Sequence, residues 1–337
     1  MKNIVVVGGG TGTFTVLSGL KKYTRNLAAI VSMADSGGST GILKDELGAL
    51  PPGDIRRCLV ALSNSDQLLR ELFSYRFENG GLEGHSFGNL LITALEKITG
   101  SFEKAVEKAG EILAIEGKVI PVTTGKVELY ARLENGRIIK GEANIDDPKH
   151  DGHLKIIEVF LRPNARVNKK AEDAIKRADL IVIGPGDLYT SVIPNLLVKG
   201  ISRAIRRSRA KKVYVCNLMT KFGETHKYKT SDFVEAIEKY LGKNVLDYVI
   251  VNSKKPPKKL LLKYKKEKKA LVEIDEEKFK DKKFLLIPAK VMSNKNLIRH
   301  DSDKLARLLL AVGELENVLK FVKCCGEFPG VKPREIG

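Results

Sequence analysis

Three clusters of glycine with serine or threonine have the composition of loops that bind phosphate groups. The first occupies residues 8–12, the second follows Asp35 at residues 36–41, and the third covers residues 184–191. Each comes directly after a short apolar run that predicts a buried strand. Glycine lets the backbone approach a ligand closely, and free N–H groups at a helix start attract anions. Because open sheets bind ligands at the carboxyl ends of their strands, the sequence predicts a nucleotide- or phosphate-binding crevice there.

None of these loops matches a nucleotide-binding fingerprint in full. Thr13 stands where the dinucleotide fingerprint G-x-G-x-x-G places its third glycine, and no Lys-Ser or Lys-Thr follows the glycines as it does in a P-loop. Asp35 lies about where dinucleotide folds place the acid that binds a ribose. NAD is therefore one ligand that the sequence permits, although no His-Asp or Tyr-x-x-x-Lys proton relay is evident.

Residues 84–88 match the nucleophile motif G-x-S-x-G letter for letter. That motif needs a strand before the serine, whereas residues 76–83 form a segment rich in glycine, asparagine and glutamate. We therefore predict that Ser86 is not a covalent nucleophile and that no residue is catalytic. His85 or Ser86 is expected to cap the helix that contains Asn89, and two interpretations stay open: a ligand contact or a plain cap.

Charged residues near predicted helix starts are further candidates. Asp54 can N-cap a helix over residues 55–63. Arg56 and Arg57 lie in its first turn, where a cation is unfavourable beside the helix dipole unless it faces a bound anion. The alternative is an arginine folded back to solvent or to Asp54. Arg299, just before the C-terminal helix, is a candidate anion contact.

Composition narrows the class of protein. The chain has 337 residues, 43% of them hydrophobic, and a net charge of +18, which favours anionic partners. The lysine-rich block at 254–283 also carries acids and few aromatics, so we interpret it as a solvated surface and expect no nucleic-acid binding. The acids and histidines at 146–153 lie in a predicted loop, and we expect no metal there. No run is long enough for a membrane span, and cytoplasmic location is expected.

The strand and helix signals alternate along most of the chain. This alternation predicts an α/β fold with a doubly wound, Rossmann-like, mostly parallel sheet. Alternating strands around Asn135 and Gly136 predict a small β-hairpin insertion at about residues 120–165. We expect a nucleotide-binding domain over residues 1–310, then a C-terminal helix and tail over 311–337.

Several ordered motifs resemble the bacterial gluconeogenesis factor family. They are residues 8–12 (GGGTG), 33–41 (MADSGGSTG), 51–56 (PPGDIR), 84–90 (GHSFGNL), 183–186 (IGPG), 216–220 (CNLMT), 223–225 (GET) and 297–301 (LIRHD). That family is related to 2-phospho-L-lactate transferase, a CofD-like enzyme that moves a phospholactyl group from a guanylyl diphosphate to a deazaflavin. The resemblance covers the chain to about residue 310.

The resemblance implies a cytoplasmic protein that binds UDP-sugars such as UDP-N-acetylglucosamine. It also implies a role in cell shape and wall precursor flux during growth on gluconeogenic carbon sources. A protein partner in cell-wall metabolism and a homodimer are both possible and stay open. A transferase acting on a nucleotide-linked donor is the alternative. Two residues depart from the pattern of the family. Ser36 stands where the transferase has a second aspartate, and the loss of this ligand argues against a magnesium site. Asp187 replaces a serine, and we expect its carboxylate to point away from the phosphates or to bind a sugar hydroxyl.

The ligand-binding residues that we predict are Gly9, Gly10, Thr11, Gly12, Asp35, Ser36, Gly37, Gly38, Ser39, Thr40, Asp54, Arg56, His85, Ser86, Asn89, Gly184, Pro185, Gly186, Thr190, Ser191 and Arg299.

Overall fold

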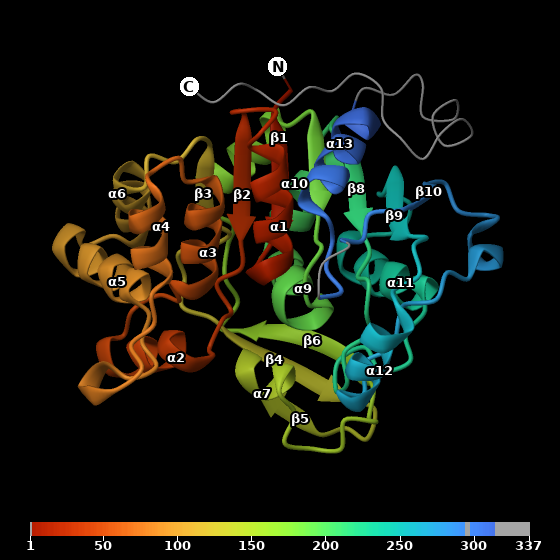
Figure 1. Ribbon diagram of the computed structural model, residues 1–337, viewed down its shortest axis with the longest axis horizontal. Coiled ribbons are helices and arrows are strands. Elements are labelled where there is room, and N and C mark those ends of the chain that lie inside the picture. The colour runs from red at the N-terminus through yellow and green to blue at the C-terminus, as the bar shows by residue number, and fades with distance from the viewer. Residues whose placement is uncertain (1, 294–296, 314–337) are drawn as a thin grey trace.

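The computed structural model describes residues 2–293 and 297–313, which form a parallel sheet covered by helices on both faces (Figure 1). The sheet has seven strands in the order β10-β9-β8-β7-β1-β2-β3, and every neighbouring pair is parallel. The predicted doubly wound α/β fold is therefore confirmed. The strands of this sheet are β1 (Ile4–Gly8), β2 (Leu27–Val31), β3 (Lys118–Pro121), β7 (Leu180–Ile183), β8 (Lys211–Val215), β9 (Tyr248–Asn252) and β10 (Leu285–Ala289).

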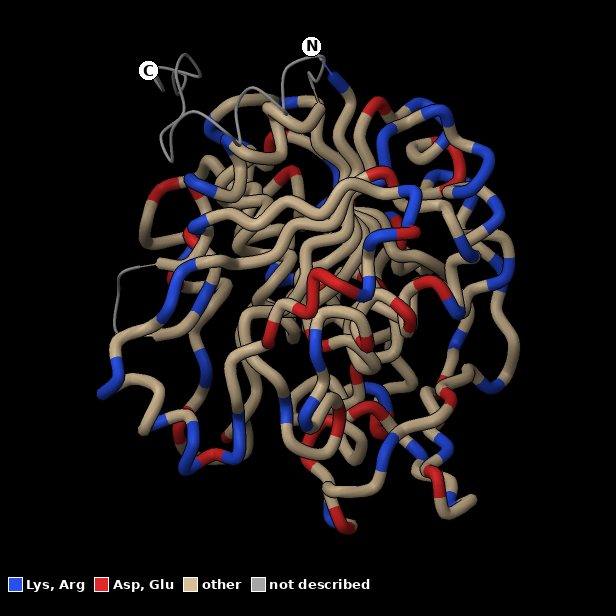
Figure 2. The backbone as a smooth tube through the Cα atoms, turned by 90° about the vertical axis from the view of Figure 1, so that its right-hand side faces the viewer, with Lys and Arg blue, Asp and Glu red and all other residues tan. Residues whose placement is uncertain are grey.

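The core lies on both faces of the central strands. Every residue of β1, β2 and β7 is buried, as their continuous apolar sequences require in a sheet covered on two sides. Helix α1 contacts both α3 and α13 on one face, and α8, α9, α10 and α11 form a connected layer on the other. The strands β1, β2 and β7 contain no charged residue, and Figure 2 shows the charged residues concentrated away from the centre of the sheet.

The helices are α1 (Gly10–Leu20), α2 (Gly38–Leu47), α3 (Gly53–Leu62), α4 (Gln67–Ser74), α5 (Phe87–Thr99), α6 (Phe102–Ile112), α7 (Glu142–Asp146), α8 (Lys169–Arg177), α9 (Ile193–Leu197), α10 (Ile201–Arg207), α11 (Thr230–Leu241), α12 (Lys258–Lys266) and α13 (Ser302–Gly313). In the part of the chain that the structure describes, no helix has the length and apolar character needed to cross a membrane.

A small antiparallel sheet forms the predicted β-rich insertion. It contains β4 (Glu128–Leu133), β5 (Ile138–Lys140) and β6 (Ile156–Arg162) in the order β5-β4-β6. Asn135 and Gly136 lie in the turn between β4 and β5, as the hairpin signal predicted. Figure 1 shows this sheet below the carboxyl ends of the large sheet, so the insertion and its helix α7 face the ends of the parallel strands.

Two predicted helices differ from the observed ones. The sequence predicts one helix near residues 194–207, and this is wrong, because α9 and α10 are separate and the backbone of Lys199 bonds to Ala165 and Val167. Gly200 makes this break possible with a φ of +110°. The sequence also predicts a helix over residues 303–322, and the structure describes it as α13 only as far as Gly313. The remainder, and the tail to residue 337, lie outside the described residues.

Candidate functional site

A cavity of about 680 Å³ opens at the carboxyl ends of β1, β2 and β7. These three strands are neighbours in the sheet, and the glycine loop after each of them lines the same cavity. The predicted convergence of the three loops is confirmed. The strand order reverses between β1 and β7, which is where a doubly wound sheet leaves room for a ligand.

Most of the predicted site residues line this cavity, and four lie just behind its wall. The lining residues among them are Gly9, Gly10, Thr11, Gly12, Asp35, Gly37, Gly38, Ser39, Thr40, Asp54, Arg56, Asn89, Pro185, Gly186, Thr190, Ser191 and Arg299. The four outside the lining are Ser36, His85, Ser86 and Gly184.

The first and third glycine loops touch each other directly. A Cβ atom added to Gly12 would lie 2.1 Å from the carbonyl oxygen of Pro185, and one added to Gly9 would lie 2.3 Å from Asp54 Oδ2. Only glycine permits the approach at residue 12, since real Cβ atoms do not come so close to a backbone oxygen, whereas a Cβ at residue 9 would have to displace the Asp54 side chain. The sequence predicts a helix from about Val16, but α1 begins six residues earlier, at Gly10. The N-terminus of α1 therefore points into the cavity.

Asp54 does not cap its helix, which corrects the prediction. It lies within the first turn of α3, whose N-cap is Pro52, and its carboxylate accepts a hydrogen bond from the backbone N–H of Gly10. Arg57 Nη1 lies 3.7 Å from Asp54 Oδ1, so this arginine folds back onto the acid. Burial, with the negative charge of Asp35 nearby, raises the pKa of Asp54 to about 7. Asp54 is thus a carboxyl group that can gain or lose a proton near neutral pH.

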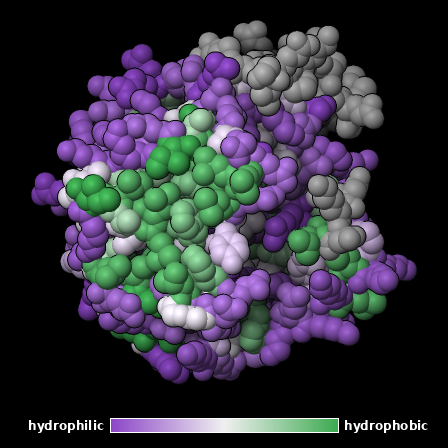
Figure 3. Space-filling model, turned by 60° about the vertical axis from the view of Figure 1, so that its left-hand side comes forward, coloured by the Kyte–Doolittle hydropathy of each residue, from purple (hydrophilic) through white to green (hydrophobic). Residues whose placement is uncertain are grey.

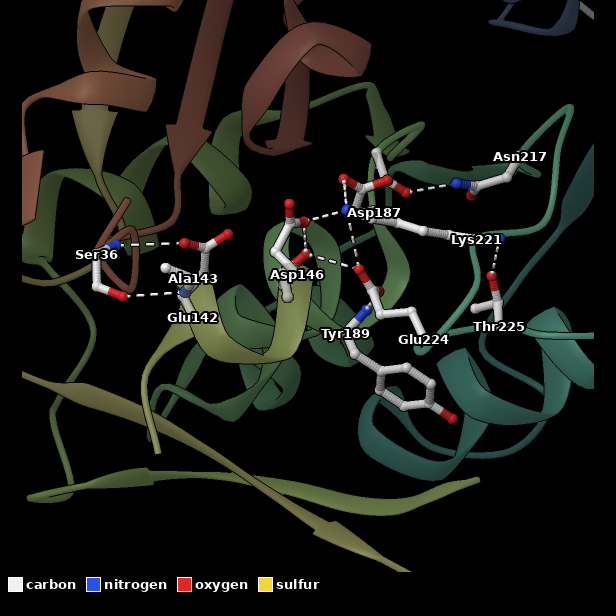
Figure 4. Close-up of polar contacts among 12 residues, drawn as sticks. Ser36, Glu142, Ala143, Asp146, Asp187, Tyr189, Asn217, Lys221, Glu224 and Thr225 are labelled. Carbon is white, nitrogen blue, oxygen red and sulfur yellow. Dashed lines mark hydrogen bonds and ion pairs between the residues drawn. The ribbon is translucent and has the colours of Figure 1, made fainter. Parts of the chain in front are cut away.

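The second glycine loop is held to the insertion by Ser36 and Glu142. Glu142 Oε2 accepts a hydrogen bond from the N–H of Ser36 at 3.3 Å, and Ser36 Oγ accepts one from the N–H of Ala143 at 3.1 Å (Figure 4). Asp35 accepts hydrogen bonds from Thr40 Oγ1 at 2.9 Å and from the N–H of Gly37 at 3.0 Å. Ser36 therefore connects the loop to α7 at the position where the transferase is expected to carry a second aspartate.

Glu142 brings a third acid to the cavity beside Asp35 and Asp54. Burial, together with the charges of Asp35 and Asp146, raises the pKa of Glu142 to about 8. A carboxyl group of this kind is largely protonated at neutral pH and can donate a hydrogen bond. The cavity floor is consequently less negative than its number of acids suggests.

Lys221 gathers three carboxylates at one side of the cavity. Its Nζ lies 3.0 Å from Asp187 Oδ2 and 3.5 Å from Glu224 Oε1, and it also pairs with Asp146 (Figure 4). The three acids have carboxylate oxygens within 4.8 Å of one another, and the ammonium supplies their counter-charge. Burial by itself lowers the pKa of Lys221, but the carboxylates outweigh it and raise that pKa.

Asp187 is therefore paired with Lys221 and lines the cavity, instead of pointing away. Glu224 is buried and accepts hydrogen bonds from the N–H of Tyr189 at 2.9 Å and from Thr190 Oγ1 at 3.1 Å. These contacts fix the third glycine loop and its continuation against the loop that carries Lys221.

Arg56 belongs to a buried polar network under the second loop. Its Nε donates to Asn89 Oδ1 at 2.9 Å, and Nη1 donates to the carbonyl of Phe73 at 3.3 Å. Asn89 Nδ2 donates to Ser39 Oγ at 3.3 Å, and His85 Nδ1 lies 3.1 Å from that same hydroxyl. Burial lowers the pKa of Arg56 to about 10, so the guanidinium stays charged at neutral pH.

Ser86 is the N-cap of α5, one of the two roles that the sequence left open. Its Oγ accepts a hydrogen bond from the N–H of Asn89 at 3.3 Å, and its side chain is fully buried. We predict that a fluorophosphonate probe will not label Ser86, because no strand leads into this turn and, among the described residues, its hydroxyl oxygen is bound by the backbone N–H of Asn89 and by no basic side chain. Mass spectrometry of the treated protein checks this, and a modified Ser86 peptide would contradict it.

Sequence reasoning missed several lining residues. Lys221, Glu142 and Asn217 had no assigned role, although Asn217 falls in a motif quoted above. Tyr264 and Lys269 also line the cavity, so the interpretation of residues 254–283 as a solvated surface is wrong for these two. The sequence signal that could have indicated a binding role here was a tyrosine, Tyr264, within a run of lysines. Arg299 is exposed on the cavity rim.

Comparisons with known proteins identify relatives over most of the chain. Residues 4–292 match the family model of 2-phospho-L-lactate transferase CofD. The chain is 43% identical to the gluconeogenesis factor of Bacillus subtilis, over 91% of this chain and 96% of that protein, and 42% identical to that of Listeria innocua, over 92% and 95%. The crystal structure of protein BH3568 from Bacillus halodurans superposes with a TM-score of 0.88 at 43% identity, over 92% of this chain and 99% of that one.

Proposed function

The chain belongs to the 2-phospho-L-lactate transferase CofD family, and on that premise we propose that it is a cytoplasmic regulatory protein that binds a nucleotide sugar of the UDP-N-acetylglucosamine type. Its relatives named gluconeogenesis factor support a role in growth on gluconeogenic carbon sources. Cell shape and wall precursor flux, with a protein partner in cell-wall metabolism, are the further parts of this proposal.

One observation carries the proposal: three glycine loops from neighbouring strands line one cavity of about 680 Å³. Backbone N–H groups of the loops and the N-terminus of α1 suit a diphosphate. Arg57, Arg76 and Arg299 also line the cavity and add positive charge. The volume is in the range of pockets that hold whole ligands of this size.

A transferase acting on a nucleotide-linked donor is the second candidate. The observation that favours it is the group formed by Asp35, Asp54 and Glu142, because two of these acids have pKa values raised toward neutrality. Such groups can carry protons in a reaction. The nearby Ser36, where a second aspartate is expected, argues against a magnesium-dependent version. An NAD-dependent dehydrogenase is third, since only Asp35 supports it.

Calorimetry with UDP-N-acetylglucosamine, GTP and NAD, each with and without magnesium, tests these candidates. The proposal expects heat only with the UDP-sugar and no product after prolonged incubation. Magnesium-dependent consumption of a nucleotide-linked donor would establish the transferase instead. Binding of NAD alone would contradict both leading candidates.

We predict that affinity for UDP-N-acetylglucosamine falls as the pH rises from 6 to 8.5. Asp54 and Glu142 are neutral below their raised pKa values of about 7 and about 8, and ionisation above these values places negative charge beside the diphosphate. The diphosphate itself has no proton to lose in this range. A repulsion on the order of 1 kcal/mol corresponds to a loss of about fivefold.

Calorimetry of the variants Asp54→Asn and Glu142→Gln checks the cause of this pH dependence. Each should flatten the profile, whereas Glu111→Gln, an exposed acid on α6, should leave it unchanged. A wild-type affinity that is constant from pH 6 to 8.5 would show that neither acid approaches the bound diphosphate.

A further inference from the structure

Residues 254–269 concentrate the positive charge of the chain. This segment contains nine lysines and a single acid, Glu267, so it carries +8 of the net charge of +18. More than half of it is helix α12, whose inner side is half-buried against a small apolar cluster through Leu260, Leu261 and Tyr264. The outer side of α12 is exposed, and we call it the basic face; it consists of Lys258, Lys259, Leu262, Lys263 and Lys266.

The ammonium groups of the basic face have no acidic partner within the described chain. None of its four lysines takes part in the ion pairs found among residues 2–293 and 297–313, and Glu267 pairs with Lys269 at 2.8 Å instead. On α8, by contrast, Lys169 and Lys170 each pair with two acids. Networks of that kind are typical of the solvated surfaces of heat-stable proteins. The charge of the basic face is therefore available to an anionic partner from outside the chain.

The composition of the basic face distinguishes between anionic partners. Protein interfaces are enriched in arginine and depleted in lysine, and single-stranded nucleic acids are bound through stacked aromatic rings. The basic face has no arginine and no aromatic residue. Tyr264 lies on the inner side, where its hydroxyl accepts a hydrogen bond from the N–H of Ile298 at 3.1 Å. Lysine is a hydrated point charge on a flexible stem, so it suits a surface whose anionic groups have no fixed positions.

We propose that the basic face of α12 binds the surface of a bilayer that contains anionic lipids. Clusters of about four to eight basic residues on an amphipathic helix attract anionic headgroups, which can move in the bilayer to match them. Leu262 is 62% exposed in the middle of the face, and its side chain can enter the boundary between headgroups and acyl chains. The face thus combines the charge and the apolar contact of a helix that lies on a membrane surface.

The basic face is close to the cavity but separate from it. Tyr264 of α12 lines the cavity, and Figure 1 shows α12 at the end of the molecule where the parallel strands finish and the insertion lies. None of the five residues of the basic face lines the cavity. Binding to a bilayer consequently needs no nucleotide, and it can be tested whether or not the cavity holds a UDP-sugar.

Co-sedimentation of the full chain with vesicles tests the basic face. Vesicles of phosphatidylcholine mixed with phosphatidylglycerol should bind the wild-type chain, whereas vesicles of phosphatidylcholine alone should not. Added sodium chloride should weaken the binding, because salt screens exposed charges. A fourfold variant of α12 should lower the partition coefficient about tenfold or more, since it reverses every charge of the face. Its substitutions are Lys258→Glu, Lys259→Glu, Lys263→Glu and Lys266→Glu.

A second fourfold variant is the matched control, because it changes the net charge by the same amount. It reverses four exposed lysines on other parts of the chain, namely Lys104→Glu, Lys118→Glu, Lys176→Glu and Lys199→Glu. The control should retain most of the wild-type binding to anionic vesicles. Circular dichroism melting checks the fold, and the α12 variant should melt as wild type does because its four lysines are exposed and unpaired.

Three outcomes would overturn the proposal. Wild type that does not sediment with anionic vesicles at low salt would refute it. Equal losses in the two fourfold variants would show an effect of net charge alone, without a site on α12. Wild type that ignores vesicles but binds a single-stranded oligonucleotide, and loses this in the α12 variant, would assign the basic face to nucleic acid instead.

Discussion

The substitution Gly12→Ala is expected to lower the free energy of unfolding by about 2 kcal/mol. The new Cβ would lie 2.1 Å from the carbonyl oxygen of Pro185 and 2.9 Å from the nitrogen of Gly186. Both are backbone atoms, so the two loops must separate, which costs about 3 kcal/mol by analogy with overpacked cores. Alanine recovers about 1 kcal/mol because Gly12 lies within α1 and alanine is the better helix former.

Urea denaturation measures this effect as a lower midpoint at an unchanged slope. Gly81→Ala is the control, because a Cβ at Gly81 meets nothing within 4 Å and Gly81 has no positive φ. The control should keep the wild-type midpoint. Equal midpoints for Gly12→Ala and wild type would mean that the first and third loops are not in the close contact described above.

The parts of the fold that the sequence predicted well are those with a strong local signal. β1 and β7 are continuous β-branched runs that end in glycine, and Asn135 with Gly136 is the best short signal for a hairpin. These strand and hairpin signals were enough to predict the parallel sheet, the glycine loops at its strand ends and the β-rich insertion. The same local signals located most of the cavity lining, because residues at the ends of neighbouring parallel strands must converge.

Contacts between distant segments could not be predicted in this way. Lys221 is one lysine among many in the sequence, and only the fold brings it to Asp146 and Asp187. Glu142 reaches the second glycine loop because the insertion turns back over the strand ends, which no local pattern encodes. Asp54 had the residue type and position of an N-cap, but its carboxylate is bound instead by Gly10 from a different loop.

The orientation of α5 could not be predicted for a related reason. Its apolar spacing predicted a helix correctly, and the usual assumption buries the apolar side in the core of the same chain. The structure buries the side with Asn89, Ile92 and Thr93, because Asn89 holds Arg56 and Ser39 beneath the cavity, and it leaves Ile98 exposed, on the side of the molecule where Figure 3 shows a broad hydrophobic area. A periodic pattern predicts a helix but does not say which of its residues will face the core.

Arg299→Ala is expected to weaken binding of UDP-N-acetylglucosamine about tenfold or more. Arg299 lines the cavity rim, is exposed, and takes part in none of the ion pairs found among residues 2–293 and 297–313. Its guanidinium is therefore available to a diphosphate, in contrast to Arg57, which faces Asp54, and Arg56, which is held by Asn89. A charge-assisted hydrogen bond of this kind contributes roughly 1.5–3 kcal/mol.

Titration calorimetry at fixed ionic strength measures the loss, with Arg25→Ala as the matched control. Arg25 is an exposed arginine paired with Glu116 away from the cavity, so its removal lowers the net charge equally and should leave the affinity unchanged. If both variants lose affinity alike, the effect is a long-range one of net charge. If Arg299→Ala keeps its fold and binds as wild type does, the diphosphate lies away from the rim and contacts the glycine loops alone. These loops donate through backbone N–H groups, which no side-chain substitution on the rim removes.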